Sequence, residues 1–404
     1  MGASPGAPGS QLVGRVLLAL PAALRGALLP GRPRLGAADV PAPTPAPPGE
    51  VRLYVAPANS AGQGHLWARA AARELDGVGA ASMSIRRGAG YEFPADTIVD
   101  SRVVTWSTAW QRAQRRAVET GFTHVLAESQ RRLFGGPYSP DPLEEISALR
   151  AAGLGVALLC HGSDVRLPSR HAAVEPDSPF QPGVLAATPE LERQAARAHR
   201  IIAEAGVPVF VSTLGTLADV PHATWLPVVV DVDRWGAAAE TAPPPLAADR
   251  LPAVVHAPSS SAMKGSDLVD PDLEALDAEG VVTYRRLRDV PAAEMPAAYA
   301  GTDIVLDQFR LGDYGVAAVE AMAAGRVVVA HVSDDVRRGI RERTGLELPI
   351  VEARGAEAAA AVRELVADPA RAAAVGEAGA EFARAVHDGR RSAAALAGFL
   401  GRPA

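Results

Sequence analysis

Short runs of apolar residues alternate with longer amphipathic segments along most of the chain. The runs are rich in Val, Ile, Leu and Ala, as expected for strands that are buried on both faces. The segments between them carry Ala, Arg and Glu at spacings typical of helices that cover a sheet. This alternation predicts an α/β chain with parallel sheets between layers of helices.

The predicted strands form two series. A Pro-rich stretch, Ala242–Leu246, lies between them and is expected to be a linker. The first series contains Val51–Ala56, Ala81–Ile85, Arg102–Thr105, Thr123–Leu126, Gly155–Cys160 and Val207–Val211. The second contains Pro252–His256, Val281–Tyr284, Asp303–Asp307, Val327–Ala330 and Pro349–Val351.

Two Rossmann-like, doubly wound domains that face each other across a cleft are therefore expected, because 404 residues exceed the size of one core. We place the first domain at residues 50–240 and the second at 241–404. The last helix of the chain is expected to be able to pack back on the first domain.

Residues 1–49 are rich in Pro, Gly and Ala and are expected to be disordered. Within them, the apolar stretch Leu12–Leu29 is interrupted by Arg15, Pro21 and Arg25, so it is too short to span a bilayer. Two alternatives stay open: a helix that associates weakly with a membrane surface, or an unstructured start.

Composition narrows the class of protein. A net charge of −6 argues against nucleic-acid binding. The one cysteine, Cys160, excludes a disulfide within the chain and a cysteine-based metal site. We therefore expect a cytoplasmic protein, and peripheral contact with the inner face of the membrane stays open as an alternative.

The most informative stretch is Gly312–Gly325, which lies between the strands Asp303–Asp307 and Val327–Ala330. A turn, Gly312-Asp313-Tyr314-Gly315-Val316, precedes a short helix whose free N–H groups and positive dipole end suit phosphate. Two turns further along, Glu320 can accept hydrogen bonds from adjacent ribose hydroxyls. The arrangement predicts a pocket for a nucleoside diphosphate.

Three further segments complete a familiar order: His161-Gly162-Ser163-Asp164, the stretch Leu226–Trp235, and Lys264-Gly265. Together with Tyr314–Gly325 they resemble the retaining, nucleotide-sugar-dependent glycosyltransferases of the GT-B fold (glycosyltransferase group 1, family 4-like). The resemblance runs from about residue 51 to about residue 368.

The resemblance implies roles for particular residues. Glu320 would bind ribose, Lys264 would neutralise the diphosphate, and His161 would lie against the donor sugar. The turn at Gly312–Val316 and the serines Ser259 and Ser260 would bind phosphate. The residues expected on the acceptor side or at the diphosphate loop are Asn59, Gly62, Gly64, Glu128 and Asp164.

The chain departs from the family pattern at two places. The family has a glutamate eight residues before the ribose-binding one, where this chain has Gly312 and, one residue off register, Asp313. Many relatives also have an arginine before the lysine, where this chain has Pro258. Arg310 is therefore a candidate for the second positive charge, beside that of Lys264, at the diphosphate.

The expected reaction is transfer of a sugar from a nucleoside-diphosphate sugar to an acceptor hydroxyl, with retention of configuration. No metal and no cofactor besides the donor substrate are expected; the Asp231-Val232-Asp233 spacing falls at the predicted hinge. Two alternatives stay open: a catalytically silent protein that binds nucleotide sugar or glycan, and a nucleotide-sugar epimerase. The sequence leaves the base, the sugar and the acceptor undetermined.

Overall fold

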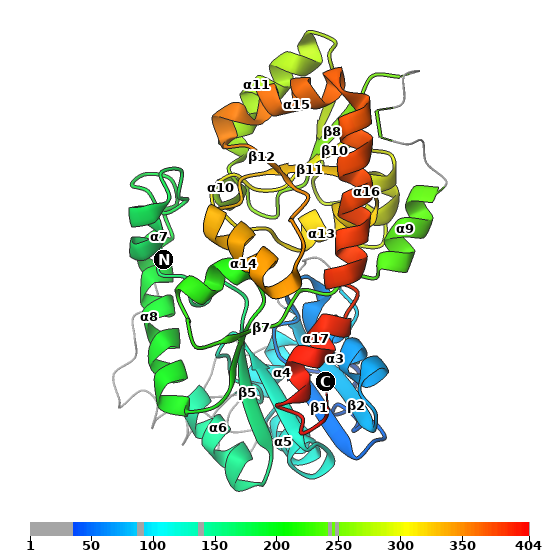
Figure 1. Cartoon of the computed structure of the whole chain (residues 1–404). Coiled ribbons are helices and arrows are strands. Elements are labelled where there is room, and N and C mark those ends of the chain that lie inside the picture. The colour runs from blue at the N-terminus through cyan, green and yellow to red at the C-terminus, as the bar shows by residue number, and fades with distance from the viewer. Residues whose placement is uncertain (1–34, 87–92, 136–140, 241–244, 247–249, 404) are drawn as a thin grey trace.

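The computed structural model describes residues 35–86, 93–135, 141–240, 245–246 and 250–403. Two α/β domains lie one above the other, the N-terminal domain below and the C-terminal domain above in Figure 1. This confirms the predicted fold class.

The first domain is built on a seven-stranded parallel sheet of order β3-β2-β1-β4-β5-β6-β7. Leu53 and Val55 of β1 enter one apolar cluster, while Tyr54 and Ala56 enter another, so both faces of the sheet are buried. The strands are β1 Val51–Ala56, β2 Val78–Arg86, β3 Thr97–Asp100, β4 His124–Glu128, β5 Gly155–Cys160, β6 Val209–Val211 and β7 Thr224–Trp225. The helices are η1 Ala37–Asp39, η2 Ser60–Gly62, α3 Gln63–Glu74, α4 Ser101–Trp106, α5 Thr108–Gly121, α6 Pro142–Ala151, α7 Pro168–Val174, α8 Thr188–Ala205 and η4 Leu214–Ala218.

The second domain has a five-stranded parallel sheet of order β12-β11-β10-β8-β9. Its strands are β8 Ala253–His256, β9 Thr283–Arg286, β10 Ile304–Leu306, β11 Val327–Ala330 and β12 Val351–Glu352. The helices that follow the first domain are α9 Val232–Glu240, α10 Ser261–Lys264, α11 Ser266–Ala278, α12 Met295–Ala300, α13 Val316–Ala323, α14 Asp334–Thr344, η5 Gly355–Glu357, α15 Ala358–Ala367, α16 Pro369–Val386 and α17 Arg390–Ala397.

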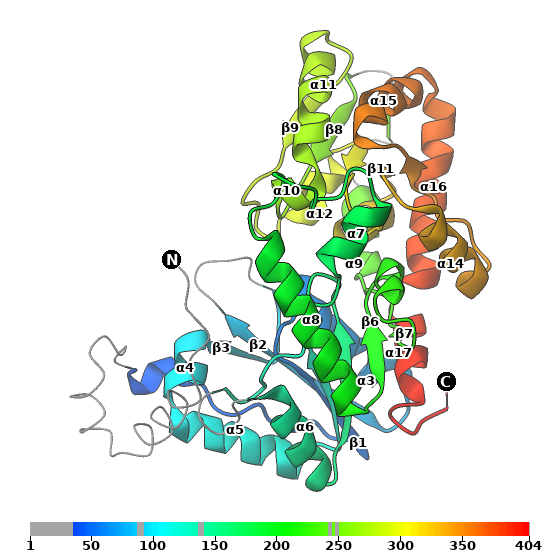
Figure 2. The ribbon, with the colours of Figure 1, turned by 90° about the vertical axis from the view of Figure 1, so that its left-hand side faces the viewer.

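The chain crosses between the domains twice. Trp235 of α9 packs against Tyr299 of the second domain with ring centroids 5.5 Å apart, so α9 already lies against the second domain. After α16 the chain returns, and α17 lies on the lower domain in Figures 1 and 2. There Ser392 Oγ donates to the carbonyl of Pro227 at 2.8 Å, and Phe399 meets His124 edge-on.

Two sequence expectations are wrong in detail. Arg102–Thr105 lies in α4 rather than in a strand, because the Asp100 carboxylate accepts from the backbone N–H of Arg102 and caps the helix. The expectation of disorder over residues 1–49 is wrong for 35–49: Thr44 is buried, and its N–H donates to Gln114 Oε1 at 2.8 Å. The predicted membrane-surface stretch Leu12–Leu29 lies outside the described residues.

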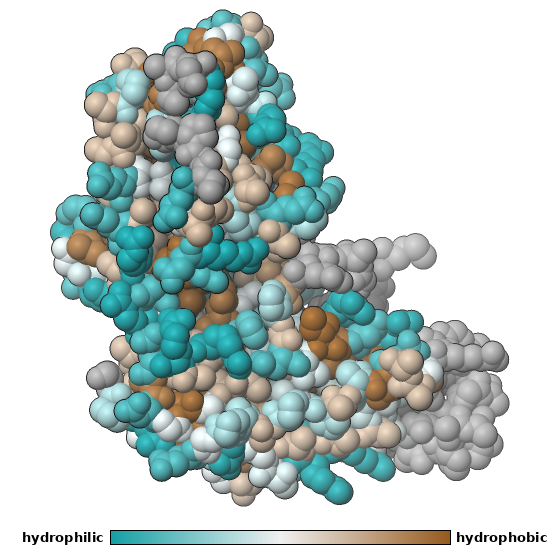
Figure 3. All heavy atoms as spheres, turned by 90° about the vertical axis from the view of Figure 1, so that its right-hand side faces the viewer, coloured by the Kyte–Doolittle hydropathy of each residue, from teal (hydrophilic) through white to brown (hydrophobic). Residues whose placement is uncertain are grey.

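The face shown in Figure 3 is mostly hydrophilic, and its apolar side chains gather in small separate groups. The large apolar side chains that are exposed, such as Val174 and Leu251, come from distant parts of the chain. Scattered apolar residues of this kind are ordinary on a protein surface. Among the described residues, no helix is both long and apolar enough to cross a membrane.

Candidate functional site

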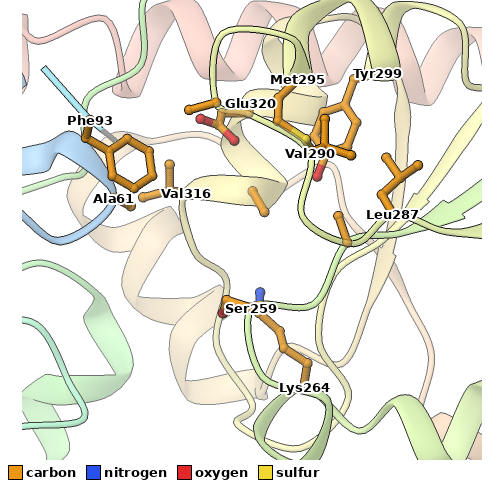
Figure 4. Close-up of a pocket in the computed structure, with 13 residues that line it drawn as sticks. Ala61, Phe93, Ser259, Lys264, Leu287, Val290, Met295, Tyr299, Val316 and Glu320 are labelled. Atoms are coloured by element: carbon orange, nitrogen blue, oxygen red, sulfur yellow. The ribbon is translucent and has the colours of Figure 1, made fainter. Parts of the chain in front are cut away.

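A cavity of about 390 Å³ opens where the two domains meet, at the C-terminal ends of the second domain's strands. Figure 4 shows that residues of both domains line it. The lining residues are Ala61, Phe93, Ala257, Ser259, Lys264, Leu287, Val290, Ala292, Met295, Tyr299, Val316, Ala317 and Glu320. Of the predicted donor-site residues, the structure brings Ser259, Lys264, Val316 and Glu320 together here.

Glu320 lies in α13, and its carboxylate points into the cavity (Figure 4). Desolvation by the cavity wall raises the pKa of Glu320 to about 8, against the lowering effect of the nearby Arg234 charge. Among the described residues, no side chain or backbone group makes a hydrogen bond to this carboxylate. A desolvated carboxyl group without a protein partner can accept the hydroxyls of a ligand.

Lys264 ends the short helix α10 on the wall opposite Glu320 (Figure 4). Its ammonium group donates to the carboxylate of Asp307, which follows β10 and is 1% exposed. The second oxygen of Asp307, Oδ2, is buried and has no hydrogen-bond partner. The cavity wall therefore carries a cation, Lys264, that is already paired with a buried carboxylate behind the wall.

An apolar wall lies between these charged groups. Leu287, Val290, Met295 and Tyr299 form it, and Figure 4 shows them along one side of the cavity. Ser259 lies near the Lys264 ammonium group (Figure 4), whereas Ser260 precedes α10 and its carbonyl accepts from the Lys264 N–H at 2.9 Å. Planar groups fit against such an apolar wall, so the cavity combines a hydrophobic slot with polar ends.

The residues of the turn before α13 lie in two places, some near the cavity and others at the interface between the domains. Gly315 precedes the helix, and a Cβ placed there would meet no atom within 4 Å, so its backbone is open to a ligand. Gly312 has a φ of +62°, and a Cβ there would lie 2.8 Å from Glu175 Oε1 of the first domain. Both the conformation and the close carboxylate favour glycine at this position.

Asp313 and Tyr314 face the first domain and the crossover segment instead of the cavity. Asp313 accepts from the N–H of Gly215 at 3.1 Å and lies 3.9 Å from Arg166. Burial raises the pKa of Asp313, while the Arg166 charge opposes that shift. The Tyr314 hydroxyl lies 3.2 Å from His387 Nε2. Both residues therefore hold the domains together, and Asp313 does not take the place of the missing glutamate.

The predicted first-domain residues form a second cluster, centred on Glu128 at the end of β4. This fully buried carboxylate accepts from the N–H groups of Ala58 at 2.8 Å and Asn59 at 2.9 Å, and lies 3.0 Å from His161 Nε2. A Cβ on Gly64 would lie 3.1 Å from the same carboxylate. The Asn59–Gly64 loop is thus held by Glu128.

His161 and Asp164 complete this cluster. The Asp164 carboxylate accepts from the His161 N–H at 3.0 Å. Burial disfavours a charged His161 ring, but the hydrogen bond and charge of Glu128 outweigh it and raise the pKa of His161. Gly62 lies behind the lining residue Phe93, since a Cβ on Gly62 would be 3.2 Å from Phe93 Cδ1. His161 does not line the cavity itself.

Sequence reasoning missed Asp307, Phe93 and Tyr299. Asp307 had a usable signal, because it is an acidic residue directly after a buried strand. No sequence signal points to Phe93 or Tyr299, because their position at the cavity depends on how the two domains meet. The candidate second cation, Arg310, lies elsewhere: its guanidinium donates to Asp267 and to the carbonyl of Asp177. Within the described residues, no group of three or more His, Cys, Asp or Glu side chains could hold a metal ion.

Residues 265–398, most of the second domain, match the family described as "Glycosyl transferase-like". No curated protein sequence matches the chain.

Solved structures resemble nearly the whole chain. A sucrose-phosphate synthase from Thermosynechococcus elongatus has a TM-score of 0.52 at 12% identity, covering 84% of this chain and 96% of that one. Anabaena HepE in complex with UDP and glucose has a TM-score of 0.53 at 13% identity, covering 86% and 98%. A glycosyltransferase from Rickettsia africae has a TM-score of 0.51 at 12% identity, covering 86% and 97%. The fold is that of GT-B glycosyltransferases.

Proposed function

We propose that the chain is a glycosyltransferase that takes its sugar from a nucleoside-diphosphate donor and binds that donor in the cavity of Figure 4. The observation that carries the proposal is the placement of Lys264 and Glu320 on opposite walls of one interdomain cavity. The fold and the family match of residues 265–398 support it. A fold by itself hosts many functions, so the proposal rests on the residues of the cavity.

The donor would lie with its base on the apolar wall formed by Leu287, Val290 and Met295. Glu320 would accept the ribose hydroxyls, because its carboxyl group has no protein partner among the described residues. The diphosphate would then reach Lys264, Ser259 and the free backbone N–H groups at the start of α13. HepE, which shares the fold, is also solved with UDP-glucose, so a uridine donor is the first to test.

Lys264 would stabilise the negative charge that grows on the diphosphate as the glycosidic bond breaks. The ammonium group is held by Asp307 before the donor arrives, which fixes its position in the cavity wall. We propose transfer with retention, in which the departing phosphate oxygen takes the acceptor proton on the same face of the sugar. Lys264 and the α13 N-terminus would supply the positive charge, so the proposal includes no metal and no further cofactor.

His161 would lie at the sugar end of the donor. It follows β5, and its ring is fixed by Glu128 and stacked near Trp67 with centroids 5.7 Å apart. Its raised pKa keeps the ring protonated over more of the neutral range, so that it can donate a hydrogen bond to a sugar hydroxyl. In the structure the ring is 10% exposed, so only an edge of it can meet a ligand.

One observation favours a silent nucleotide-sugar binder as the second candidate. The Glu175 carboxylate lies where a side chain at position 312 would extend, and His331 holds it at 3.1 Å. The position of the family's first glutamate is therefore blocked by a group that already has partners.

A panel of uridine, guanosine, adenosine and thymidine diphosphate sugars separates the two candidates. The transferase releases nucleoside diphosphate in an acceptor-dependent way, and Lys264→Ala abolishes most of that release. Saturable donor binding with no release under any acceptor mixture would support the silent binder. Absence of binding to every donor would overturn both.

A further inference from the structure

A second cavity between the domains, of about 850 Å³, adjoins the donor cavity, and we call it the α3 groove. The two cavities share Ala61, Phe93, Ala292 and Glu320 as lining residues. Helix α3 forms one side of the groove, and residues 229–235 of the first crossover form another. The donor proposed above occupies only the smaller cavity, so a second molecule can lie in the groove beside it.

His65 gives the α3 groove an accessible hydrogen-bonding atom. The residue lies in the first turn of α3 and lines the groove, and its side chain is 21% exposed. Its Nδ1 lies 3.0 Å from Ser82 Oγ, which is buried. Its Nε2 has no hydrogen-bond partner among the described residues, and it is not one of the buried polar atoms. The ring therefore contacts the protein through Nδ1 and leaves Nε2 for a ligand.

The neighbours of His65 decide which ring nitrogen carries the proton. Ser82 Oγ donates its single proton to Asp96 Oδ2 at 2.9 Å, because a carboxylate can only accept. Ser82 Oγ must then accept from His65, so the neutral ring carries its proton on Nδ1. Nε2 is thereby an acceptor, which suits a hydroxyl group.

The charge on Asp96 maintains this arrangement. Burial would favour the neutral carboxyl group, but hydrogen bonds from His65 and Ser82 and the charge of Arg69 outweigh burial and lower the pKa of Asp96. Arg69 lies 3.3 Å from the same carboxylate oxygen. Asp96 therefore stays ionised at neutral pH and continues to accept the Ser82 proton.

The lining of the α3 groove favours an uncharged ligand. Its described residues include five arginines and five carboxylate side chains, so neither sign of charge dominates. Phe93 and Trp235 add apolar aromatic surface. Sugars combine hydroxyl groups with apolar C–H faces, so they match a site of this mixed kind. The groove is about twice as large as the donor cavity, which leaves room for more than one sugar ring.

We propose, resting on the transferase function above, that the α3 groove binds the acceptor, an uncharged molecule with several hydroxyl groups such as an oligosaccharide, and that His65 Nε2 accepts a hydrogen bond from one of them. The acceptor extends past Ala61 and Phe93, which line both cavities, to the donor. His65 binds and orients the acceptor and takes no proton from it, so the reaction proposed above is unchanged.

Binding of a neutral probe can be measured without turnover. Calorimetry of maltose with protein that is saturated with UDP isolates the groove, because UDP fills the donor cavity. We expect maltose to bind, with an affinity that does not change as salt is raised, since the ligand carries no charge. Glucose should bind at least as tightly as glucose 6-phosphate. Absence of maltose binding up to about 10 mM, or a preference for the phosphate, would overturn the proposal.

His65→Phe removes both ring nitrogens and keeps most of the volume. It should lower the affinity for maltose about 5- to 10-fold, and His65→Gln, which retains an acceptor, should recover part of the loss. His222→Phe, at an exposed position outside the groove, is the matched control and should bind maltose as the wild type does.

UDP affinity, measured in the same proteins, separates binding from structure. It should be unchanged in all three variants, because His65 does not line the donor cavity. Unchanged maltose affinity in His65→Phe, or an equal loss of maltose and UDP affinity, would overturn the role of His65. Failure of the wild type to bind UDP would instead count against the proposed donor site.

Discussion

Two glutamates differ in one respect: Glu128, at the end of β4, has its partners within the protein, whereas the carboxylate of Glu320, in α13, has no hydrogen-bond partner among the described residues. Glu128 accepts from two backbone N–H groups and pairs with His161, whereas Glu320 faces a cavity with its pKa raised to about 8 by desolvation. A buried carboxylate with all its bonds made organises its surroundings. One that is desolvated and unpartnered is arranged for a ligand.

This difference separates the predicted site residues into two groups. Asn59, Gly64, Glu128 and Asp164 belong to a satisfied network that sets the shape of the loop and the position of His161. Ser259, Lys264, Val316 and Glu320 line the cavity in which we propose that the donor binds. The first group is expected to act on stability and geometry, and the second on binding and rate.

The largest effect is expected from Glu128→Ala. The substitution leaves two buried N–H groups and the buried His161 ring without their acceptor, which costs roughly 3–5 kcal/mol of unfolding free energy. Urea unfolding measures it. Glu377→Ala, on the exposed face of α16, is the control and should change stability by less than about 0.5 kcal/mol. A Glu128→Ala protein as stable as wild type would contradict the distinction between the two glutamates.

Lys264→Ala should act on rate instead. Losing one donor to the developing charge costs about 3 kcal/mol of transition-state stabilisation, or about 10²-fold in kcat. Because Lys264→Ala also removes the cation that pairs with the buried Asp307 carboxylate, the double variant Lys264→Ala/Asp307→Asn shows whether the loss of turnover comes from instability. Arg285→Ala, at an exposed position of β9, is a control for removal of a positive charge. Turnover of Lys264→Ala within twofold of wild type would remove the lysine from the mechanism.

Asp307→Asn tests the pairing of Lys264 with Asp307 through the direction in which the affinity for UDP changes. Removing the negative charge leaves the ammonium group uncompensated, so nucleoside diphosphate should bind more tightly, by about 5- to 10-fold. Turnover should fall if product release becomes slower. Calorimetry with UDP measures the affinity. If Asp307 served only to hold the fold, the same variant would bind UDP more weakly.

Much of the fold was predictable because buried parallel strands are continuous apolar runs, as Gly155–Cys160 and Val327–Ala330 show. The error at Arg102–Thr105 arose because one capping bond from Asp100 decides between strand and helix. The placement of Lys264 and Glu320 on one cavity was predictable from local motifs. Asp313, in contrast, looked like a ligand residue, but it contacts Gly215 across the interface. Contacts between domains have no local signature in the sequence.

The smallest expected effect is a pH dependence of domain association. His331 of the second domain contacts Glu175 of the first, and Glu352, Arg337 and Arg354 surround the pair. Burial disfavours the charged ring, but the two carboxylates outweigh it and raise the pKa of His331 to about 9.

A histidine with a raised pKa stabilises the folded state fully below its unfolded value, and this contribution is lost as the pH rises through the folded value. We therefore expect the thermal midpoint of the wild type to fall between about pH 6.5 and 9 by more than that of His331→Gln. An equal fall of the thermal midpoint with pH in the two proteins would show that the contact between His331 and Glu175 does not join the domains.

A structure of the protein with bound UDP would show directly whether the donor binds in this cavity. We expect the ribose hydroxyls within hydrogen-bond distance of the Glu320 carboxylate and a phosphate oxygen at the Lys264 ammonium group. The base should lie on the wall formed by Leu287, Val290 and Met295. UDP bound outside this cavity, or bound in it with Glu320 and Lys264 both out of contact, would overturn the proposed donor site.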